Sequence, residues 1–383
     1  MKLLIHSLDK EEWDRIKDKY DGWEVISDEG KIRPCVGCFG CWVKTPGECV
    51  IKDGYDRMGA LIHKADEVVV MSRYTYGGFD SFVKNVFDRC IGWVLPYFEL
   101  INGEMHHKKR YPEDKPFTFV FRGSGLTDED KAAAKQYVKA VCTNLHGSIR
   151  DVRFEDCAAS NDEVCAAEIE NRYGGTILLN CSLRGQKANS KLFLDRFGKY
   201  IEGEKRSIDL VSYINRQDEL TDILLAADRI VLGMPLYVDG IPSAVLRIME
   251  RLEKCGRDSD KKIYAVANMG FYESAQIRNL MGMVRAWCNS CGYVYGGGLA
   301  IGAGEMMGQM MKMNSIEKGP TKNVAAGMEK LSRAVNESGR TEDIYADANR
   351  FPRAFYMSMA NMSWSHGIGK NGLKRKDLLR QCE

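Results

Sequence analysis

Apolar and polar residues alternate in blocks along this chain, and the blocks predict strands and helices in turn. Short apolar runs, such as residues 2–6, 67–72 and 176–181, are each followed, directly or after a loop, by a stretch with helical periodicity. Strands that alternate with helices form parallel sheets with helices on both faces. The pattern therefore predicts an α/β protein with doubly wound sheets, in which ligands bind beyond the carboxyl ends of the strands.

One strand–loop–helix segment occurs twice. Residues 65–89 and residues 227–251 align without a gap, and the identical pairs include Arg89 with Arg251. Each copy contains an apolar strand, a glycine-containing loop and a helix. We therefore expect two α/β domains in tandem that arose by duplication.

The expected domain boundaries follow from this repeat and from a polar stretch between the two halves. The first domain takes residues 1–172 and the second takes residues 173–335. Residues 336–383 form an expected helical tail that packs on the body through aromatic side chains such as Phe351. A chain of 383 residues is long enough for two domains of ordinary size.

Composition limits the partners and the cellular compartment that we expect for this protein. The net charge is +2, which favours neither a nucleic-acid track nor a charged membrane surface as a partner. No apolar run approaches the ~20 residues that span a bilayer, and the start has no signal-peptide pattern. The 13 cysteines are odd in number and several lie in apolar runs, so we expect reduced thiols and a cytoplasmic protein.

The loop after the strand at residues 176–181 has the chemistry of a phosphate site. It combines two hydroxyl groups, one amide and two cations with the first turn of a helix. The residues concerned are Ser182, Arg184, Lys187, Asn189 and Ser190. No GxxxxGK[ST] pattern is present, which argues against nucleoside triphosphate hydrolysis. A plain strand–helix turn capped by Asn189 or Ser190 is the alternative.

The sequence SLRGQKANS in this loop is similar to the S-x-R-x-x-S-x-x-S-like loop of the NAD(P)H-dependent FMN reductase family, which has a flavodoxin-like fold. Residues 235–252 resemble the P-x-Y-x-x-x-x-P loop of that family, and residues 268–274 resemble its third flavin-contacting loop. Leu183 departs from the family pattern, where proline is usual. The resemblance covers most of residues 176–304 and implies two tandem flavodoxin-like domains.

The resemblance also implies a set of FMN-binding residues. It assigns the phosphate to Ser182, Arg184, Asn189 and Ser190. It assigns the isoalloxazine ring to two loops, which contribute Pro235, Leu236, Tyr237, Val238, Asp239 and Gly240, and Asn268, Gly270 and Phe271. Ordinary core packing is the alternative role for Tyr237 and Phe271.

The activity that the resemblance implies is transfer of hydride from NAD(P)H through FMN to a small acceptor, namely a quinone, a nitro or azo compound, or a flavin. The flavin carries this chemistry, so no separate catalytic residue is expected. The alternative is an iron–sulfur flavoprotein, or a flavodoxin-like electron carrier with a protein redox partner.

The first half lacks the equivalent phosphate loop. Its first strand is followed by Asp9, Glu11 and Glu12, which would repel a phosphate. We expect this half to bind no FMN of its own. Single-domain relatives dimerise with the flavin near the interface, so we expect the two halves to pair within the chain, with a homodimer as the alternative.

Four cysteines in the first half have the spacing C-x2-C-x2-C-x7-C, which is typical of metal ligands. They are Cys35, Cys38, Cys41 and Cys49. The motif resembles that of iron–sulfur flavoproteins with a longer last gap. A [4Fe–4S] cluster, a zinc ion, and a reduced structural or redox-active loop all remain open.

A second glycine pattern, Gly302-Ala303-Gly304-x3-Gly308, follows a strand and opens a helix, as in a dinucleotide-binding fingerprint. The acidic residue that would bind a ribose hydroxyl about 20 positions later is missing. We therefore do not expect a dinucleotide at this position.

Overall fold

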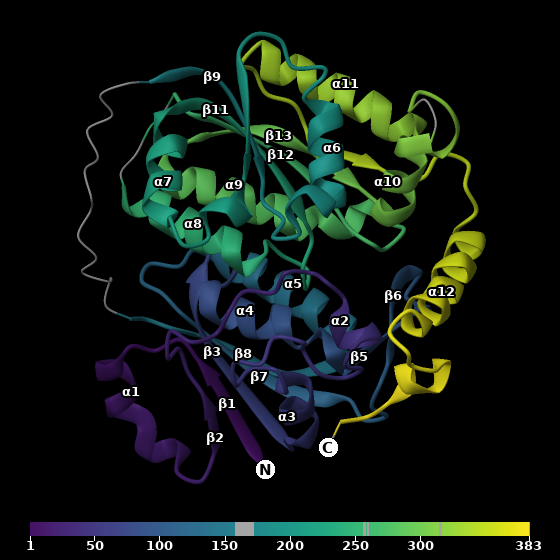
Figure 1. Ribbon diagram of the computed structural model, residues 1–383. Coiled ribbons are helices and arrows are strands. Elements are labelled where there is room, and N and C mark those ends of the chain that lie inside the picture. The colour runs from purple at the N-terminus through teal and green to yellow at the C-terminus, as the bar shows by residue number, and fades with distance from the viewer. Residues whose placement is uncertain (158–171, 256–257, 259, 314–315, 383) are drawn as a thin grey trace. The chain divides into compact units, whose positions relative to one another are not determined.

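The computed structural model describes residues 1–157, 172–255, 258, 260–313 and 316–382 (Figure 1). These residues form two compact units, one within Met1–Ser160 and Ala354–Glu383 and the other within Asn161–Arg353. Among the described residues, no helix has the length and apolar character required to cross a membrane.

The first unit is built on a parallel sheet with the strand order β2-β1-β3-β7-β8. Its strands are β1 (Lys2–His6), β2 (Glu24–Ile26), β3 (Glu67–Thr75), β7 (Lys115–Arg122) and β8 (Gly147–Glu155). Counted along the chain, this is the order 2-1-3-4-5 of the flavodoxin-like fold.

Helices α1 (Lys10–Ile16), α2 (Gly40–Val43), α3 (Met58–Lys64), α4 (Ser81–Arg89) and α5 (Asp128–Leu145) belong to the same unit. Leu4, Val69 and Val120 make an apolar cluster on one face of the sheet, where Trp13 from α1 packs. Tyr137 of α5 contacts Phe79 edge-on, with the ring centroids 5.2 Å apart.

An antiparallel hairpin, β5 (Val94–Ile101) with β6 (Glu104–Lys109), is inserted between α4 and β7. Our sequence prediction missed it, although its turn, Asn102-Gly103, carries the residue pair that favours two-residue hairpin turns. Both turn residues have positive φ, at 52° and 85°.

Helix α12 (Arg353–Gly369) and the short helix η7 (Arg375–Leu379) confirm that the end of the chain is helical. The Asn361 side chain of α12 accepts a hydrogen bond from the Phe98 amide at 2.7 Å and donates one to the Phe98 carbonyl at 3.3 Å. Trp364 packs edge-on against Trp42, with the ring centroids 5.1 Å apart. Residues from Ala354 onward are therefore part of the first unit.

The second unit repeats the strand order and adds one strand, giving β10-β9-β11-β12-β13-β14, all parallel. Its strands are β9 (Tyr173–Asn180), β10 (Lys205–Asp209), β11 (Ala227–Pro235), β12 (Lys262–Asn268), β13 (Val294–Ile301) and β14 (Ile344–Ala346). The two parallel sheets confirm the predicted fold class. Strand β14 comes from the segment that we expected to be tail.

Helices cover both faces of this second sheet (Figure 1). They are α6 (Asn189–Phe197), α7 (Gln217–Ala226), α8 (Ser243–Lys254), α9 (Arg278–Cys291), α10 (Gly304–Met313) and α11 (Lys322–Asn336).

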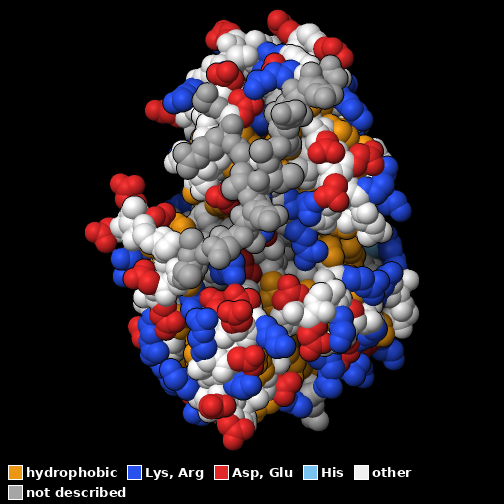
Figure 2. Space-filling model, turned by 90° about the vertical axis from the view of Figure 1, so that its left-hand side faces the viewer, with side chains coloured by type: hydrophobic (Ala, Val, Ile, Leu, Met, Phe, Trp, Pro, Cys, Tyr) orange, Lys and Arg blue, Asp and Glu red, His pale blue; other side chains and the backbone are white. Residues whose placement is uncertain are grey.

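The surface carries charges of both signs. On the face that Figure 2 shows, acidic and basic side chains are interspersed, in keeping with the small net charge.

The two copies of the repeat fold into the same local structure. In the first, Thr75 pairs with Gly78 across a tight turn before α4. In the second, Tyr237 and Gly240 form the equivalent bridge before α8. Positive φ angles at both central residues identify a type I′ turn in each copy. The sequence repeat is therefore also a repeat of backbone conformation.

Candidate functional site

Three loops of the second unit meet beyond the carboxyl ends of β9, β11 and β12, as the fold requires. Asn268, at the end of β12, joins all three. Its side-chain oxygen accepts a hydrogen bond from the Ser190 hydroxyl at 2.7 Å, and its carbonyl accepts one from the Leu236 amide at 2.8 Å. The structure thus brings the predicted phosphate loop and the predicted ring loops to one edge of the sheet.

The phosphate loop is held by its own hydrogen bonds. The Gly185 amide, at a φ of 54°, donates to the Ser182 carbonyl at 3.0 Å. The Asn180 side chain donates to the Gly185 carbonyl at 3.2 Å and to the Asp209 carboxylate at 2.7 Å. Ser182 and Ser190 are buried within the loop, whereas the two cations, Arg184 and Lys187, are exposed.

Helix α6 starts without a side-chain cap. Its N-cap residue is Ala188, which offers no acceptor to the first amides of the helix. The two residues expected to cap it, Asn189 and Ser190, instead lie inside the helix as its first two residues. There the Ser190 hydroxyl donates to Asn268 and the Asn189 side-chain amide donates to Glu305, each at 2.7 Å. The alternative of a plain capped turn does not describe this helix, whose N-terminus suits an anion.

The equivalent turn of the first unit is filled by protein carboxylates. Asp9 caps α1 by accepting a hydrogen bond from the Glu12 amide at 2.8 Å, and the Glu12 side chain accepts one from the Asp9 amide at 3.1 Å. Behind this turn, the Asp80 carboxylate accepts hydrogen bonds from the Ser7 hydroxyl, from the Ser72 hydroxyl at 2.7 Å and from the Arg73 backbone amide at 3.0 Å. Protein carboxylates therefore occupy this turn, and nearby cations pair with them, Arg73 with Asp9 at 3.6 Å and Arg122 with Glu12 at 2.8 Å.

The first ring loop is strained. Val238 and Asp239 occupy the centre of the type I′ turn with φ angles of 38° and 60°. A β-branched residue at positive φ costs about 1–3 kcal/mol, and such strain is common at ligand sites. Pro235, Leu236, Tyr237 and Val238 are half-buried, whereas Asp239 and Gly240 are buried.

The second ring loop follows β12. Asn268 is buried, Phe271 is half-buried and Gly270 is exposed. A methyl group added at Gly270 would meet no protein atom within 4 Å, so the chain's own packing does not require glycine there.

Close packing explains the Gly302-x-Gly304-x3-Gly308 pattern. An added Cβ would lie 2.1 Å from the Tyr272 carbonyl at Gly302, 2.9 Å from the Met269 carbonyl at Gly304 and 2.5 Å from the Asn189 side chain at Gly308. These glycines let the start of α10 pack against α6 and the second ring loop. This packing accounts for glycine at all three positions.

Two carboxylates beside the phosphate loop escaped our sequence analysis. Asp209, at the end of β10, accepts a hydrogen bond from Gln186 at 2.6 Å as well as the one from Asn180. Glu305, on α10, accepts the hydrogen bond from Asn189. The order of the strands could have indicated Asp209, because β10 is the neighbour of β9. No local pattern indicates Glu305.

The four candidate metal ligands lie in one loop of the first unit with different exposure. Cys35 is half-buried, Cys38 is exposed, and Cys41 and Cys49 are buried. Burial raises the pKa of the Cys35 thiol to about 12 and that of the Cys41 thiol well above its usual value. In the part of the chain that the structure describes, no group of three or more His, Cys, Asp or Glu side chains is arranged to hold a metal ion. Metal ligation by these cysteines stays a prediction.

Nitrogen donors nevertheless point at three of these sulfur atoms. The Gly37 amide lies 3.5 Å from the Cys35 sulfur, and the Gly40 amide lies 3.4 Å from the Cys38 sulfur. The Nε of Arg89 donates to the Cys49 sulfur at 3.1 Å. Such hydrogen bonds favour anionic sulfur.

Arg89 is fully buried and uses all five of its N–H groups. Besides the Cys49 sulfur, it donates to both carboxylate oxygens of Asp53 at 2.9 Å, to the Arg33 carbonyl at 2.7 Å and to the Ile51 carbonyl at 2.9 Å. Burial alone raises the pKa of Asp53, but the hydrogen bonds and charge of Arg89, together with the backbone amides of Arg33 and Tyr55, more than offset this and bring it to about 2. Arg89 therefore organises the cysteine loop.

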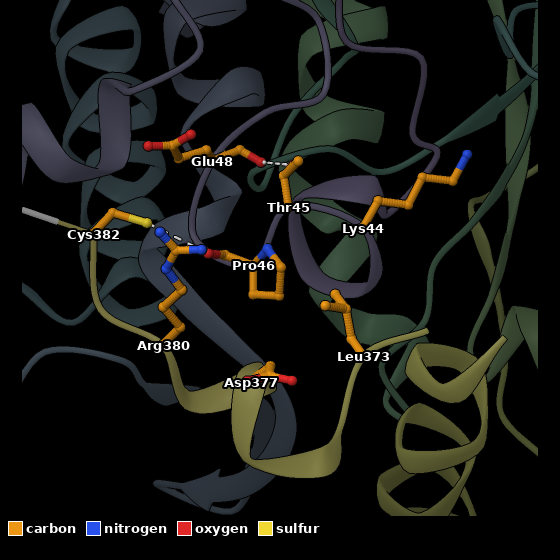
Figure 3. A pocket seen from close by; sticks show the side chains of 8 residues that line it. All are labelled: Lys44, Thr45, Pro46, Glu48, Leu373, Asp377, Arg380 and Cys382. Carbon is orange, nitrogen blue, oxygen red and sulfur yellow. Dashed lines mark hydrogen bonds between the residues drawn. The ribbon is translucent and has the colours of Figure 1, made fainter. Parts of the chain in front are cut away.

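A cavity of about 170 Å³ lies between the cysteine loop and the end of the chain (Figure 3). It is lined by Lys44, Thr45, Pro46, Glu48, Leu373, Asp377, Arg380 and Cys382. Buried Arg110 anchors the end of the chain by donating to the Leu378 carbonyl at 2.8 Å and to the Arg380 carbonyl at 2.6 Å. Two cations and two carboxylates balance in the lining, so the cavity favours no charged ligand.

Comparison with known proteins adds little. No protein-family model matches the chain, and no curated protein matches it significantly. One similar solved structure is an azoreductase from Bacillus anthracis str. Sterne, with 15% identity over 43% of this chain and 100% of that chain and a TM-score of 0.32. Another is an FMN-dependent NADH-azoreductase from Bacillus anthracis str. Ames Ancestor in complex with FMN, with 12% identity over 44% of this chain and 100% of that chain and a TM-score of 0.28. Likeness this weak carries no argument, and the flavodoxin-like assignment depends on the strand order.

Proposed function

We propose that this chain is an FMN-dependent NAD(P)H oxidoreductase and that FMN binds in the second unit. The observation that carries the proposal is the uncapped start of α6, which lies next to two exposed cations and two buried hydroxyl groups. An anion at this position would accept hydrogen bonds from free backbone amides and be attracted by the helix dipole. The equivalent turn of the first unit is occupied by Asp9 and Glu12, so we propose that this unit binds no FMN.

The residues have separate roles in this proposal. Arg184 and Lys187 attract the phosphate, and the Ser182 hydroxyl donates a hydrogen bond to it. Ser190, whose hydroxyl donates to Asn268, contributes its backbone amide at the start of α6, and Asn189 orients the phosphate. The turn at residues 237–240 and the loop at residues 268–271 would hold the isoalloxazine ring against the edge of the sheet. When bound, FMN supplies hydride transfer from NAD(P)H to a quinone, a nitro or azo compound, or another flavin.

Of the two alternatives, the iron–sulfur flavoprotein is favoured by one observation, the N–H groups directed at Cys35, Cys38 and Cys49. Hydrogen bonds to sulfur are one means by which proteins set the potential of iron–sulfur clusters. We derive no step from such a cluster. Iron analysis of anaerobically purified protein decides between the two: about four iron atoms per chain would support the alternative, and none would remove it.

The first test is FMN binding to the apo-protein, with riboflavin as the ligand that lacks the phosphate. Arg184→Ala should raise the Kd for FMN about 10- to 100-fold, the usual loss for a charge-assisted contact, and leave the Kd for riboflavin unchanged. Arg206→Ala, on exposed β10, is the matched control. An unchanged Kd for FMN in the Arg184 variant would remove the phosphate-loop assignment. Failure of the wild-type protein to bind any flavin would refute the function.

A further inference from the structure

A carboxylate lies next to the site where we place the phosphate. Glu305, the second residue of α10, accepts a hydrogen bond from the side-chain amide of Asn189 at 2.7 Å, and Asn189 is the first residue of α6. The other carboxylate oxygen of Glu305 is 3.5 Å from the Gln309 amide. A donor that would otherwise be available to a phosphate is thus already bound to a protein anion.

The backbone under Glu305 is held in place. Ala303, just before α10, has a φ of 50°, and its amide donates to the Phe271 carbonyl at 2.6 Å. Gly304 and Gly308 pack so closely against Met269 and Asn189 that a side chain at either position would clash. This packing fixes the start of α10 against α6 and so places the backbone of Glu305 beside the phosphate loop, within reach of Asn189.

The charges around the loop cancel. Arg184 and Lys187 contribute two positive charges, while Asp209 and Glu305, each hydrogen-bonded to a loop side chain, contribute two negative charges. Lys191, the next cation on α6, is already paired with Asp195. A phosphate dianion therefore gains the helix N-terminus and neutral hydrogen bonds but little net attraction from charged side chains.

We propose that Glu305 weakens the phosphate subsite so that flavin mononucleotide exchanges with solution instead of being held permanently. This inference rests on the proposed function, because it concerns the same site. Free FMN would then bind to the enzyme and leave it as a substrate does. This agrees with a flavin as one of the expected electron acceptors.

Glu305→Gln tests the proposal directly, because glutamine keeps an oxygen that can accept the hydrogen bond from Asn189 and loses only the charge. The Kd of the apo-protein for FMN should fall about tenfold at low salt, chiefly through slower dissociation. Removal of one negative charge near the phosphate dianion relieves a repulsion of about that size when water partly screens the two groups. The gain should shrink at 0.5 M NaCl, where screening is strong. Riboflavin affinity should not change.

Glu329→Gln is the matched control, since it removes the same charge from an exposed ion pair with Arg333 on α11. Glu305→Ala, which also removes the hydrogen-bond acceptor, separates charge from positioning. An unchanged or raised Kd for FMN in Glu305→Gln would overturn the proposal, as would tightening by alanine but not by glutamine. Equal wild-type affinity for FMN and riboflavin would instead refute the phosphate loop itself, so the two failures are distinguishable.

Discussion

Replacing Arg89 with methionine should destabilise the first unit by about 3–5 kcal/mol, the usual cost of leaving one partner of a buried ion pair without the other. Methionine has a similar length and leaves little cavity, so the loss reflects charge and hydrogen bonds rather than volume. Asp53, whose side chain is 8% exposed, would keep only the exposed Arg33 guanidinium as a cation, 4.0 Å away. The Arg33 and Ile51 carbonyls and the Cys49 sulfur would each lose a donor.

Tryptophan fluorescence is the natural assay. Five of the six tryptophans lie in the first unit, and the second unit contains only Trp287. Urea unfolding followed by fluorescence therefore reports on the unit that contains Arg89. Asp53→Asn should destabilise less after Arg89→Met than it does alone, and the coupling in this double-mutant cycle should be about 1.5–3 kcal/mol.

The repeat supplies the control. Arg251 occupies the position equivalent to Arg89, but its ion pair with Asp218 is exposed, with 39% and 89% of the two side chains accessible. Arg251→Met should therefore cost the second unit less than about 1 kcal/mol, as exposed ion pairs usually do. Circular dichroism, which follows both units, is the readout for this comparison. If Arg89→Met costs no more than this, Arg89 does not organise the cysteine loop. Faster alkylation of Cys49 in Arg89→Met would show that the loop itself has opened.

Three further predictions follow from strain, pH and the end of the chain. Val238→Asn should stabilise the second unit by about 1 kcal/mol, because asparagine tolerates the φ of 38° in the type I′ turn; calorimetry that shows no rise in Tm would contradict the strain. Burial lowers the pKa of His6 from 6.5 to about 4, so the unfolded chain binds a proton first as the pH falls. Burial of His6 should therefore contribute a drop of about 2 kcal/mol in stability between pH 7 and pH 4.5. Buried His107, whose pKa is lowered to about 3, adds a drop of its own. His6→Phe should remove about 2 kcal/mol of the total while a change at exposed His366 should not, as measured by urea unfolding at both pH values. Ending the chain at Lys374 removes two of the carbonyl acceptors of buried Arg110, those of Leu378 and Arg380, and should cost the first unit about 2–4 kcal/mol in the same assay. An unchanged unfolding midpoint would show that the last residues do not anchor to Arg110.

The amino-acid sequence by itself determined the fold class and the region in which to look for a ligand. Alternating apolar strands and amphipathic helices are patterns that short stretches of sequence reveal. Few topologies accommodate this alternation, so it is enough to predict parallel sheets. The loops after β9, β11 and β12 then lie at one edge because all carboxyl ends of a parallel sheet do. The gapless repeat likewise predicted two equivalent turns, and both have the same backbone conformation.

Tertiary structure alone decided which side chains meet across long stretches of sequence. Glu305 contacts Asn189 because α10 packs on α6. Arg89 donates hydrogen bonds to acceptors in the cysteine-containing loop, from Arg33 to Asp53. The helical end of the chain was predicted, but its division between the units was not, because β14 joins the second sheet while Ala354–Glu383 belongs to the first unit. Short-range patterns encode secondary structure through periodicity and capping, whereas these contacts depend on how whole elements pack. A carboxylate that balances the charge of a phosphate loop is therefore visible only once the chain is folded.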